Sequence, residues 1–89
     1  MKPIRFSTHA KGRLTIRGVS EEEVIQAILT SDWHPAELGK LECRKTYIYS
    51  NFWHGKFYKY KQVRPIFIEE EEEIVVITVY SYFFNEVKP

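Results

Sequence analysis

Residues 20–29 read SEEEVIQAIL, and this segment predicts the helical part of the fold. Ser20 is a favourable N-cap, and Glu23, three residues later, completes a capping box in which each side chain binds the other residue's backbone N–H. The acidic first turn interacts favourably with the positive end of the helix dipole. Val24 with Ile28, and Ile25 with Leu29, each four residues apart, form a face that suits a core. We therefore expect an amphipathic helix over this stretch.

Another helix is predicted just before it. Ser7 is a suitable N-cap, and the helix then covers residues 8–17 and ends at Gly18. Gly12 costs the helix interior about 1 kcal/mol relative to alanine, so this helix relies on packing. Residues 4–6, which precede the N-cap, fit a short extended segment.

The rest of the chain is rich in aromatic and β-branched residues, which favour strands. We expect strands over four segments, namely residues 41–50, 57–63, 66–70 and 73–83. Residues 51–55 have the composition of a turn or a protruding loop. Because Pro65 cannot donate to a sheet ladder, the sequence leaves open whether residues 57–70 form one bent strand or two.

The last predicted strand has two faces because side chains alternate along a strand. We expect its purely apolar face to meet the helices, and this face carries Val75, Ile77 and Val79. The other face becomes more polar toward its end and carries Ile74, Val76, Thr78, Tyr80 and Tyr82. Its polar end suits a polar ligand, and simple contact of these hydroxyl groups with water explains it equally well.

Composition limits the chain to one small domain. A content of 44% hydrophobic and 16% aromatic residues in 89 is too high for a disordered segment. We predict a single α+β domain over residues 1–89, with both helices packed on one face of a twisted antiparallel sheet of about four strands. The order is α-α-β-β-β-β. The longest apolar run is about seven residues and no signal segment opens the chain, so we expect a cytoplasmic protein with no membrane contact.

The net charge of +1 hides an uneven distribution. Five consecutive acidic residues at positions 69–73 fit a charged hairpin tip better than a cation site or a nucleic-acid mimic. Without that run, 13 basic and 7 acidic residues leave a charge of +6. His34 and His54 lack metal-ligand spacing, and we expect neither a metal nor a cofactor. Cys43, the one cysteine, excludes an internal disulfide and is expected to be a packed thiol.

His9, Arg13 and Arg17 lie four residues apart in the first predicted helix. Successive members turn by only about 40° around the helix axis, so the three side chains form one stripe. The positive helix end disfavours a charged imidazole at His9. A neutral imidazole beside two guanidinium groups suits phosphodiester cleavage, in which the imidazole takes the proton of a 2′-hydroxyl and the arginines bind the phosphate. The alternative is a solvated helix face whose arginines pair with the glutamates at positions 21–23.

A basic and aromatic stretch covers residues 56–64. Lys59 and Lys61 are expected to share one face of a strand, with tyrosines 58 and 60 on the other and Arg64 at the end. Such a surface can contact phosphates and stack on bases. The alternative, which the residues alone favour, is an edge strand whose lysines prevent aggregation.

Two parts of this sequence resemble a bacterial family of small domains of unknown function. FSTHA at residues 6–10, Arg13, and RGVS at residues 17–20 are similar to the family signature S/T-x-H-A-x-x-R-(x)3-R-G-I/V-S. IVVITVY at residues 74–80 is similar to the last strand of the family, and residues 56–67 look like a subgroup common in cyanobacteria. The family is grouped with the RelE/ParE toxin superfamily, whose fold is shared with barnase-like and other ribonucleases.

The resemblance implies a RelE-like, metal-independent ribonuclease-type fold and the toxin half of a toxin–antitoxin pair. It carries over His9, Arg13 and Arg17 as catalytic positions, with Thr78 and Tyr80 as weaker candidates. The superfamily also contains members that poison gyrase instead of cutting RNA, so the resemblance supports the fold better than the activity.

We therefore expect a toxin-like endoribonuclease that uses His9 as its base, acts on RNA and has an antitoxin protein as partner. Phosphate would be held by Arg13, Arg17 and Arg64, and the RNA backbone would be guided by Lys59 and Lys61. The alternatives are a non-catalytic module that binds a protein or a nucleic acid, and an inactive family member kept for its protein contacts. A concave basic pocket around His9 would favour the enzyme, and a convex helix face paired with glutamates would favour binding. The oligomeric state is left open, with a homodimer among the options.

Overall fold

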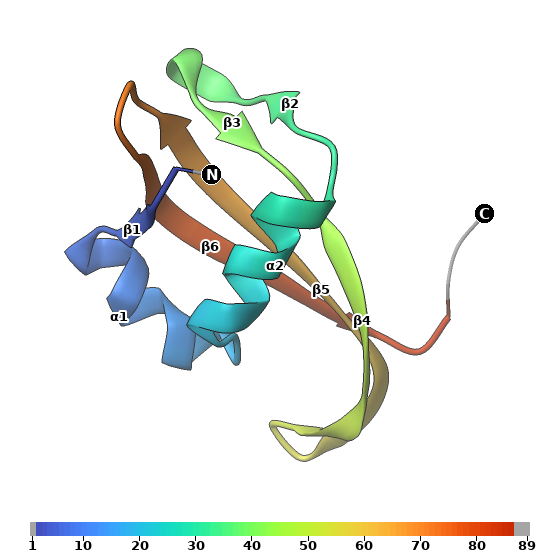
Figure 1. The fold of residues 1–89 in the computed structure, drawn as a ribbon. Helices are drawn as coiled ribbons and strands as arrows, with labels where there is room; N and C mark the ends of the chain where they lie inside the picture. The colour runs from blue at the N-terminus through green and yellow to red at the C-terminus, as the bar shows by residue number, and fades with distance from the viewer. Residues whose placement is uncertain (1, 87–89) are drawn as a thin grey trace.

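The computed structural model describes residues 2–86. In chain order the elements are β1 (Ile4–Phe6), α1 (Thr8–Arg17), α2 (Glu21–Thr30), β2 (His34–Pro35), the 3-10 turn η1 (Glu37–Gly39), β3 (Leu41–Glu42), β4 (Lys45–Trp53), β5 (Lys56–Glu69) and β6 (Ile74–Phe84). Both helices cover the same face of a curved sheet, and the β4–β5 hairpin projects from one end (Figure 1). The α+β class with two helices on one face is confirmed.

The sheet is mixed and larger than the sequence predicted. Six strands lie in the order β1-β6-β5-β3-β2, with β4 also paired to β5. β1 runs parallel to β6, while the other strand pairs are antiparallel. The prediction of about four antiparallel strands missed β1, whose partner is 70 residues away, since Ile4 lies opposite Ile74. It also missed β2 and β3 as separate strands because two residues are too few to show a hydrophobic alternation.

Both predicted helices are confirmed. The side chain of Ser7 caps α1, and Ser20 and Glu23 form the predicted capping box at the start of α2. Gly18 ends α1 with a φ of 67°. A side chain is excluded there for a second reason, since an added Cβ would lie 2.7 Å from the ring of Trp53. Gly18 therefore allows the β4–β5 hairpin to pack against the turn between the helices.

β5 is one continuous strand of 14 residues, which settles the question that Pro65 raised. On one side of β5, Ile66 pairs with Glu42 of β3 and Val63 pairs with Lys45 of β4. Pro65 therefore lies beside the gap between β3 and β4, where a ladder is already interrupted. A proline is compatible with a strand at such a place.

The β4–β5 turn is shorter than predicted. β4 continues to Trp53, so the expected loop over residues 51–55 reduces to the two residues His54 and Gly55. Both have a positive φ, of 51° and 81°, as a type I′ hairpin turn requires. The aromatic residues before the turn extend the strand instead of ending it.

A β-bulge in β6 changes the predicted faces of that strand. Ile66 lies opposite Thr78 and Phe67 lies opposite Val76, which leaves Ile77 as the extra residue. Val79 faces the helices as predicted, and Thr78 faces away from them. Before the bulge the prediction was wrong. Ile74 and Val76 belong to the core cluster, whereas Val75, although buried, and Ile77 lie outside it. The single extra residue inverts the alternation.

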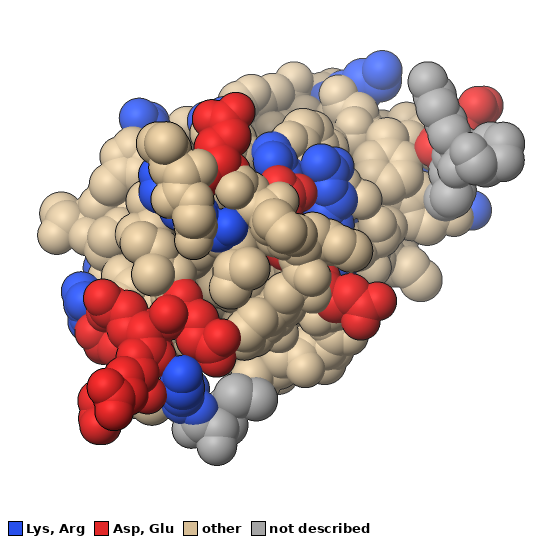
Figure 2. All heavy atoms as spheres, turned by 90° about the horizontal axis from the view of Figure 1, so that it is seen from above, with Lys and Arg blue, Asp and Glu red and all other residues tan. Residues whose placement is uncertain are grey.

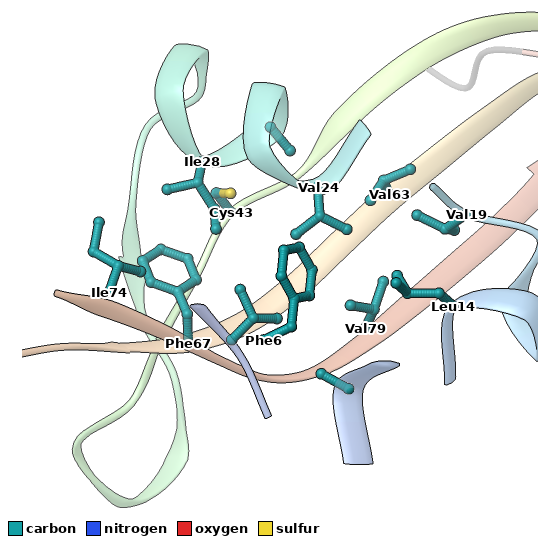
Figure 3. Packing of buried hydrophobic residues seen from close by; sticks show 13 residues of the cluster. Phe6, Leu14, Val19, Val24, Ile28, Cys43, Val63, Phe67, Ile74 and Val79 are labelled. Atoms are coloured by element: carbon teal, nitrogen blue, oxygen red, sulfur yellow. The ribbon is translucent and has the colours of Figure 1, made fainter. Parts of the chain in front are cut away.

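The core lies between the helices and the sheet (Figure 3). Its residues from the helices include Ala10, Leu14, Val24 and Ile28, and those from the sheet include Phe6, Val63, Phe67, Ile74 and Val79. Cys43 is fully buried in it, and burial raises the pKa of its thiol to about 11. The packed thiol predicted for Cys43 is thus confirmed. Within residues 2–86, neither helix has the length and apolar character needed to cross a bilayer.

Candidate active site

Helix α1 is fixed along one edge of β6 by a hydrogen bond at each end. At its start, Ser7 donates its hydroxyl to the carbonyl oxygen of Ile77 over 3.1 Å. At its end, Ser81 donates its hydroxyl to the carbonyl oxygen of Arg17 over 2.6 Å. β1 pairs with β6 only as far as Val76, so among the described residues no strand covers this edge from Thr78 onward. Side chains of α1 can therefore reach around the edge to the polar face of β6.

Four of the five predicted catalytic residues meet at this edge in two pairs. His9 Nε2 lies 3.2 Å from Thr78 Oγ1, within hydrogen-bond distance. Two turns further along α1, the guanidinium of Arg17 lies over the ring of Tyr80, 5.5 Å from its centroid. The fifth residue, Arg13, lies between the members of the helix stripe and is half-buried. It forms no ion pair with any other residue in the described part of the chain.

A second guanidinium approaches Tyr80 from β5. Arg64 lies 5.4 Å from the centroid of the Tyr80 ring, so this ring contacts two arginines. Unlike Arg17, Arg64 is neutralised, because it donates Nε and Nη2 to the two carboxylate oxygens of Glu42 over 3.1 and 2.8 Å. Its Nη1 donates to the hydroxyl of Tyr82. These bonds lower the pKa of Glu42 below its ordinary range and raise that of Arg64.

Arg17 retains unused hydrogen-bonding capacity. Its Nε is buried and has no hydrogen-bond partner in the part of the chain that the structure describes. A buried donor without a partner is unfavourable by about 1–3 kcal/mol. An acceptor brought by a ligand would relieve that cost, so the group is suited to an incoming anion.

A pocket of about 610 Å³ adjoins these residues on the sheet face opposite the helices. Its floor is formed by Arg64 and Ile66 of β5 with Ile77, Thr78 and Tyr80 of β6, and its wall by Glu42, residues 35–38 and Lys40. Thr78 and Tyr80 thus belong both to the pocket and to the edge reached by α1. Leu38 stands at the rim, largely exposed and with a φ of 56°, a conformation that is unfavourable for leucine.

The predicted nucleic-acid-binding lysines have different environments. Lys59 is exposed, but Lys61 is 5% exposed and packs against the helices. The Lys61 ammonium donates to the carbonyl oxygen of Gly18 over 2.9 Å and binds Glu23 at 2.8 Å. Lys61 therefore joins the sheet to the turn between the helices and is not presented to a ligand.

The glutamates at positions 21–23 do not neutralise the helix stripe. Glu23 binds Lys61, and the arginine ion pairs in the described residues connect Arg5 with Glu73, and both Arg44 and Arg64 with Glu42. The alternative in which the stripe arginines pair with these glutamates is therefore wrong. Sequence reasoning missed Glu42, whose meeting with Arg64 depends on the two-residue strand β3.

The acidic run forms the tip between β5 and β6, as predicted. Glu69 binds Lys2 and Glu73 binds Arg5, so part of its charge is balanced locally. The tip lies about 20 Å along β6 from Tyr80, at about 3.3 Å per residue. In Figure 2 its acidic atoms gather at the lower left, apart from the basic atoms near the middle of the view. The tip is therefore separated from the candidate site.

No three His, Cys, Asp or Glu side chains within residues 2–86 are grouped as metal ligands. Comparison of the chain with protein-family models, with curated proteins and with solved structures finds no match. The residues at the β6 edge are therefore the basis for assigning a function.

Proposed function

We propose that this protein is a metal-independent endoribonuclease whose general base is His9. The observation that carries the proposal is the 3.2 Å approach of His9 Nε2 to Thr78 Oγ1, which brings a helix side chain to the pocket on the other face of the sheet. His9 and Arg17 therefore contact Thr78 and Tyr80, two residues that line the pocket, while the helix residues themselves lie outside its lining. A base and a guanidinium group are the parts that cleavage next to a 2′-hydroxyl needs.

The contact with Thr78 engages Nε2 of His9, and we propose the tautomer in which Nε2 carries the proton. When Nε2–H donates to Thr78 Oγ1, the neutral ring carries its lone pair on Nδ1. Nδ1 then takes the proton of the 2′-hydroxyl as the 2′-oxygen attacks phosphorus. The bond from phosphorus to the 5′-oxygen breaks, and that oxygen takes a proton from water. The products are a 2′,3′-cyclic phosphate and a 5′-hydroxyl. Thr78 is in this scheme a positioning residue.

The phosphate would be bound by the helix arginines. Arg17 offers a buried Nε without a partner, and Arg13 is free of ion pairs within the described residues. Tyr80 holds the Arg17 guanidinium from one side and can present its hydroxyl to the substrate. Arg64 contributes less, because Glu42 occupies two of its three nitrogens.

The resemblance to the RelE/ParE superfamily supports the same reading. The family resemblance singles out residues in two segments almost 70 positions apart. One residue of each segment, His9 and Thr78, lies within hydrogen-bond distance of the other. We extend the proposal to a toxin role in which an antitoxin protein covers this edge.

The decisive experiment is cleavage of a mixed-sequence RNA in EDTA by the wild type, His9→Ala and Lys11→Ala. Lys11 is an exposed residue of α1 about 200° around the axis from His9, so it is a matched helix-surface control. We expect cleavage by the wild type and Lys11→Ala, and a loss of at least 100-fold in His9→Ala. Absence of cleavage by the pure wild type, with and without ribosomes, would overturn the proposal. Equal cleavage by all three proteins would identify a contaminant.

A second candidate function is a non-catalytic binding module. The specific observation in its favour is the Glu42–Arg64 pair, which places a carboxylate in the wall of the pocket and reduces its affinity for phosphate. RNA binding without cleavage, unaffected by His9→Ala, would favour this module over the enzyme.

A further inference from the structure

The β4–β5 hairpin extends beyond the rest of the sheet (Figure 1). β6 ends opposite Tyr60, since Phe84 is the last residue of β6 and pairs with it. Beyond this point β4 and β5 pair only with each other, and we call this part of the hairpin, residues 51–59, the arm. The side chain of Asn85 closes the junction by accepting from the backbone N–H of Lys59 and donating to the carbonyl oxygen of Phe57.

The arm is held in a fixed orientation. Its tip is the two-residue turn at His54 and Gly55. Trp53 stacks on Phe83 of β6 at 4.9 Å with ring planes 12° apart, and on His54 of the turn at 4.3 Å. Its ring also lies close to the backbone at Gly18. A surface ordered before binding loses less conformational entropy when a ligand arrives.

One pair of aromatic side chains on the arm is left open to solvent. Phe52 and Phe57 lie opposite each other in the β4–β5 register. Their ring centroids are 5.7 Å apart in an edge-on arrangement, and the residues are 65% and 45% exposed. They are therefore two accessible ring surfaces on a rigid support.

The charged residues along this part of the chain have one sign. Residues 43–68 contain six Lys and Arg and not a single Asp or Glu. Of these cations, Lys61 and Arg64 are committed to Glu23 and Glu42. Lys56 and Lys59 form no ion pair within the described residues, and their ammonium groups lie over the rings of Tyr58 and Tyr60. The arm therefore presents aromatic rings bordered by free positive charge.

We propose that the arm binds single-stranded nucleic acid, with Phe52 and Phe57 stacking on bases and Lys56 and Lys59 contacting phosphates. Rings bordered by cations match a ligand that carries flat bases and one negative charge per nucleotide. The outermost residues of the arm are polar or basic, namely His54, Gly55 and Lys56. Insertion of this tip into a bilayer would bury that charge, so the chemistry favours a nucleic acid over an anionic membrane.

This inference goes beyond the endoribonuclease proposal and does not require it. Phe57 and Arg64 are about 23 Å apart along β5, at about 3.3 Å per residue. A strand held by the arm could run along β5 toward the β6 edge. Binding to the arm can nonetheless be measured with a ligand that has no free 2′-hydroxyl, so the two proposals fail independently.

The test measures fluorescence anisotropy of a labelled, mixed-sequence 2′-O-methyl oligoribonucleotide of about 12 nucleotides with the full chain. Three variants are compared with the wild type: Phe52→Ala/Phe57→Ala, Lys56→Gln/Lys59→Gln, and a control, Ile16→Ala/Lys11→Gln. The control removes a 57% exposed apolar side chain and a lysine from α1. Thermal unfolding of each variant shows whether the fold is retained, which we expect because all the replaced residues are exposed and lie outside the core.

We expect the phenylalanine variant to weaken binding at least tenfold without changing its salt dependence, because stacking is not ionic. The lysine variant should weaken binding and reduce the slope of log K against log salt by about 1.4, or 0.7 for each lost phosphate contact. The control should bind like the wild type. No binding by the wild type, or undiminished binding by the phenylalanine variant, overturns the inference. Phe-dependent binding to phosphatidylserine vesicles without oligonucleotide binding would assign the arm to a membrane surface instead.

Discussion

The hydroxyl of Ser7 accepts the backbone N–H of Ala10 over 3.0 Å and donates to the carbonyl oxygen of Ile77 over 3.1 Å. The first bond caps α1, and the second attaches the cap to the extra residue of the β6 bulge. The next residue of β6, Thr78, faces the pocket and meets His9. One side chain thus fixes where the helix begins and where the candidate base lies.

We predict that Ser7→Ala destabilises the fold by about 1–2 kcal/mol, because it removes an N-cap and the bond to Ile77. For a domain of this size the melting temperature should fall by about 5–15 °C. Thermal unfolding followed by circular dichroism measures the change. Thr8→Ala, at an exposed position next to the cap, is the control and should melt close to the wild type. Equal melting of Ser7→Ala and wild type would show that the double contact contributes little.

Replacement by alanine should change stability in opposite directions at Gly12, inside α1, and at Gly18, which ends it. At Gly18, alanine must adopt a φ of 67° and displace the ring of Trp53, so we expect a loss of about 2 kcal/mol or more. At Gly12, an added Cβ meets nothing within 4 Å, so alanine should stabilise the helix by about 0.5–1 kcal/mol. Urea unfolding of both variants measures the difference. Stabilisation by Gly18→Ala would contradict the packing of Trp53 on this turn.

Local sequence signals predicted the helices because each signal acts within a few residues. The Ser20–Glu23 capping box and the stop at Gly18 need no information from the rest of the chain. The stripe containing His9 and Arg17 was also visible, since helical spacing alone produces it. The residues that the stripe contacts could not be predicted, because they depend on the edge of the sheet along which α1 lies.

The features missed in the sequence all depend on long-range contacts. The bulge at Ile77 has no glycine or proline to mark it, and one of its hydrogen bonds comes from Ser7, 70 residues earlier. The Glu42–Arg64 pair requires that a two-residue strand joins the sheet in one register. Lys61 looked like a surface lysine because its partner, Glu23, comes from the other half of the chain. In each case the local pattern was compatible with two outcomes and tertiary contacts decided between them.

We predict that Thr78→Val lowers the kcat for RNA cleavage about tenfold and leaves KM unchanged. Valine keeps the shape and strand preference of threonine but cannot accept the proton of His9 Nε2, so the reactive tautomer is no longer favoured. Steady-state kinetics on a short RNA measure both constants. Thr46→Val, an exposed hydroxyl on β4, is the control and should leave them unchanged. A rise in KM alone would place Thr78 in substrate binding and not in positioning of the base.

The thiol of Cys43 should be unreactive in the folded protein. The residue is fully buried and the pKa of its thiol is raised to about 11, so at pH 8 roughly one molecule in a thousand carries the thiolate. We expect labelling by a disulfide reagent at pH 8 to be slow in buffer and fast in urea, at a rate that follows unfolding. Fast labelling of the native protein would indicate that β3 opens readily.

The pair of Glu42 and Arg64 should make stability depend on pH in acid. Because Arg64 lowers the pKa of Glu42 in the folded state, this carboxylate stabilises the fold above its unfolded pKa of about 4.3. That contribution, about 1 kcal/mol for a half-buried ion pair, is lost as the pH falls through the lowered pKa. Glu42→Gln should therefore be less stable than the wild type at pH 7 and similar to it at pH 2.5. Urea unfolding at both values measures this, with Glu71→Gln at the exposed tip as control. A difference between Glu42→Gln and the wild type that is the same at both pH values would mean that shape, and not charge, explains the effect.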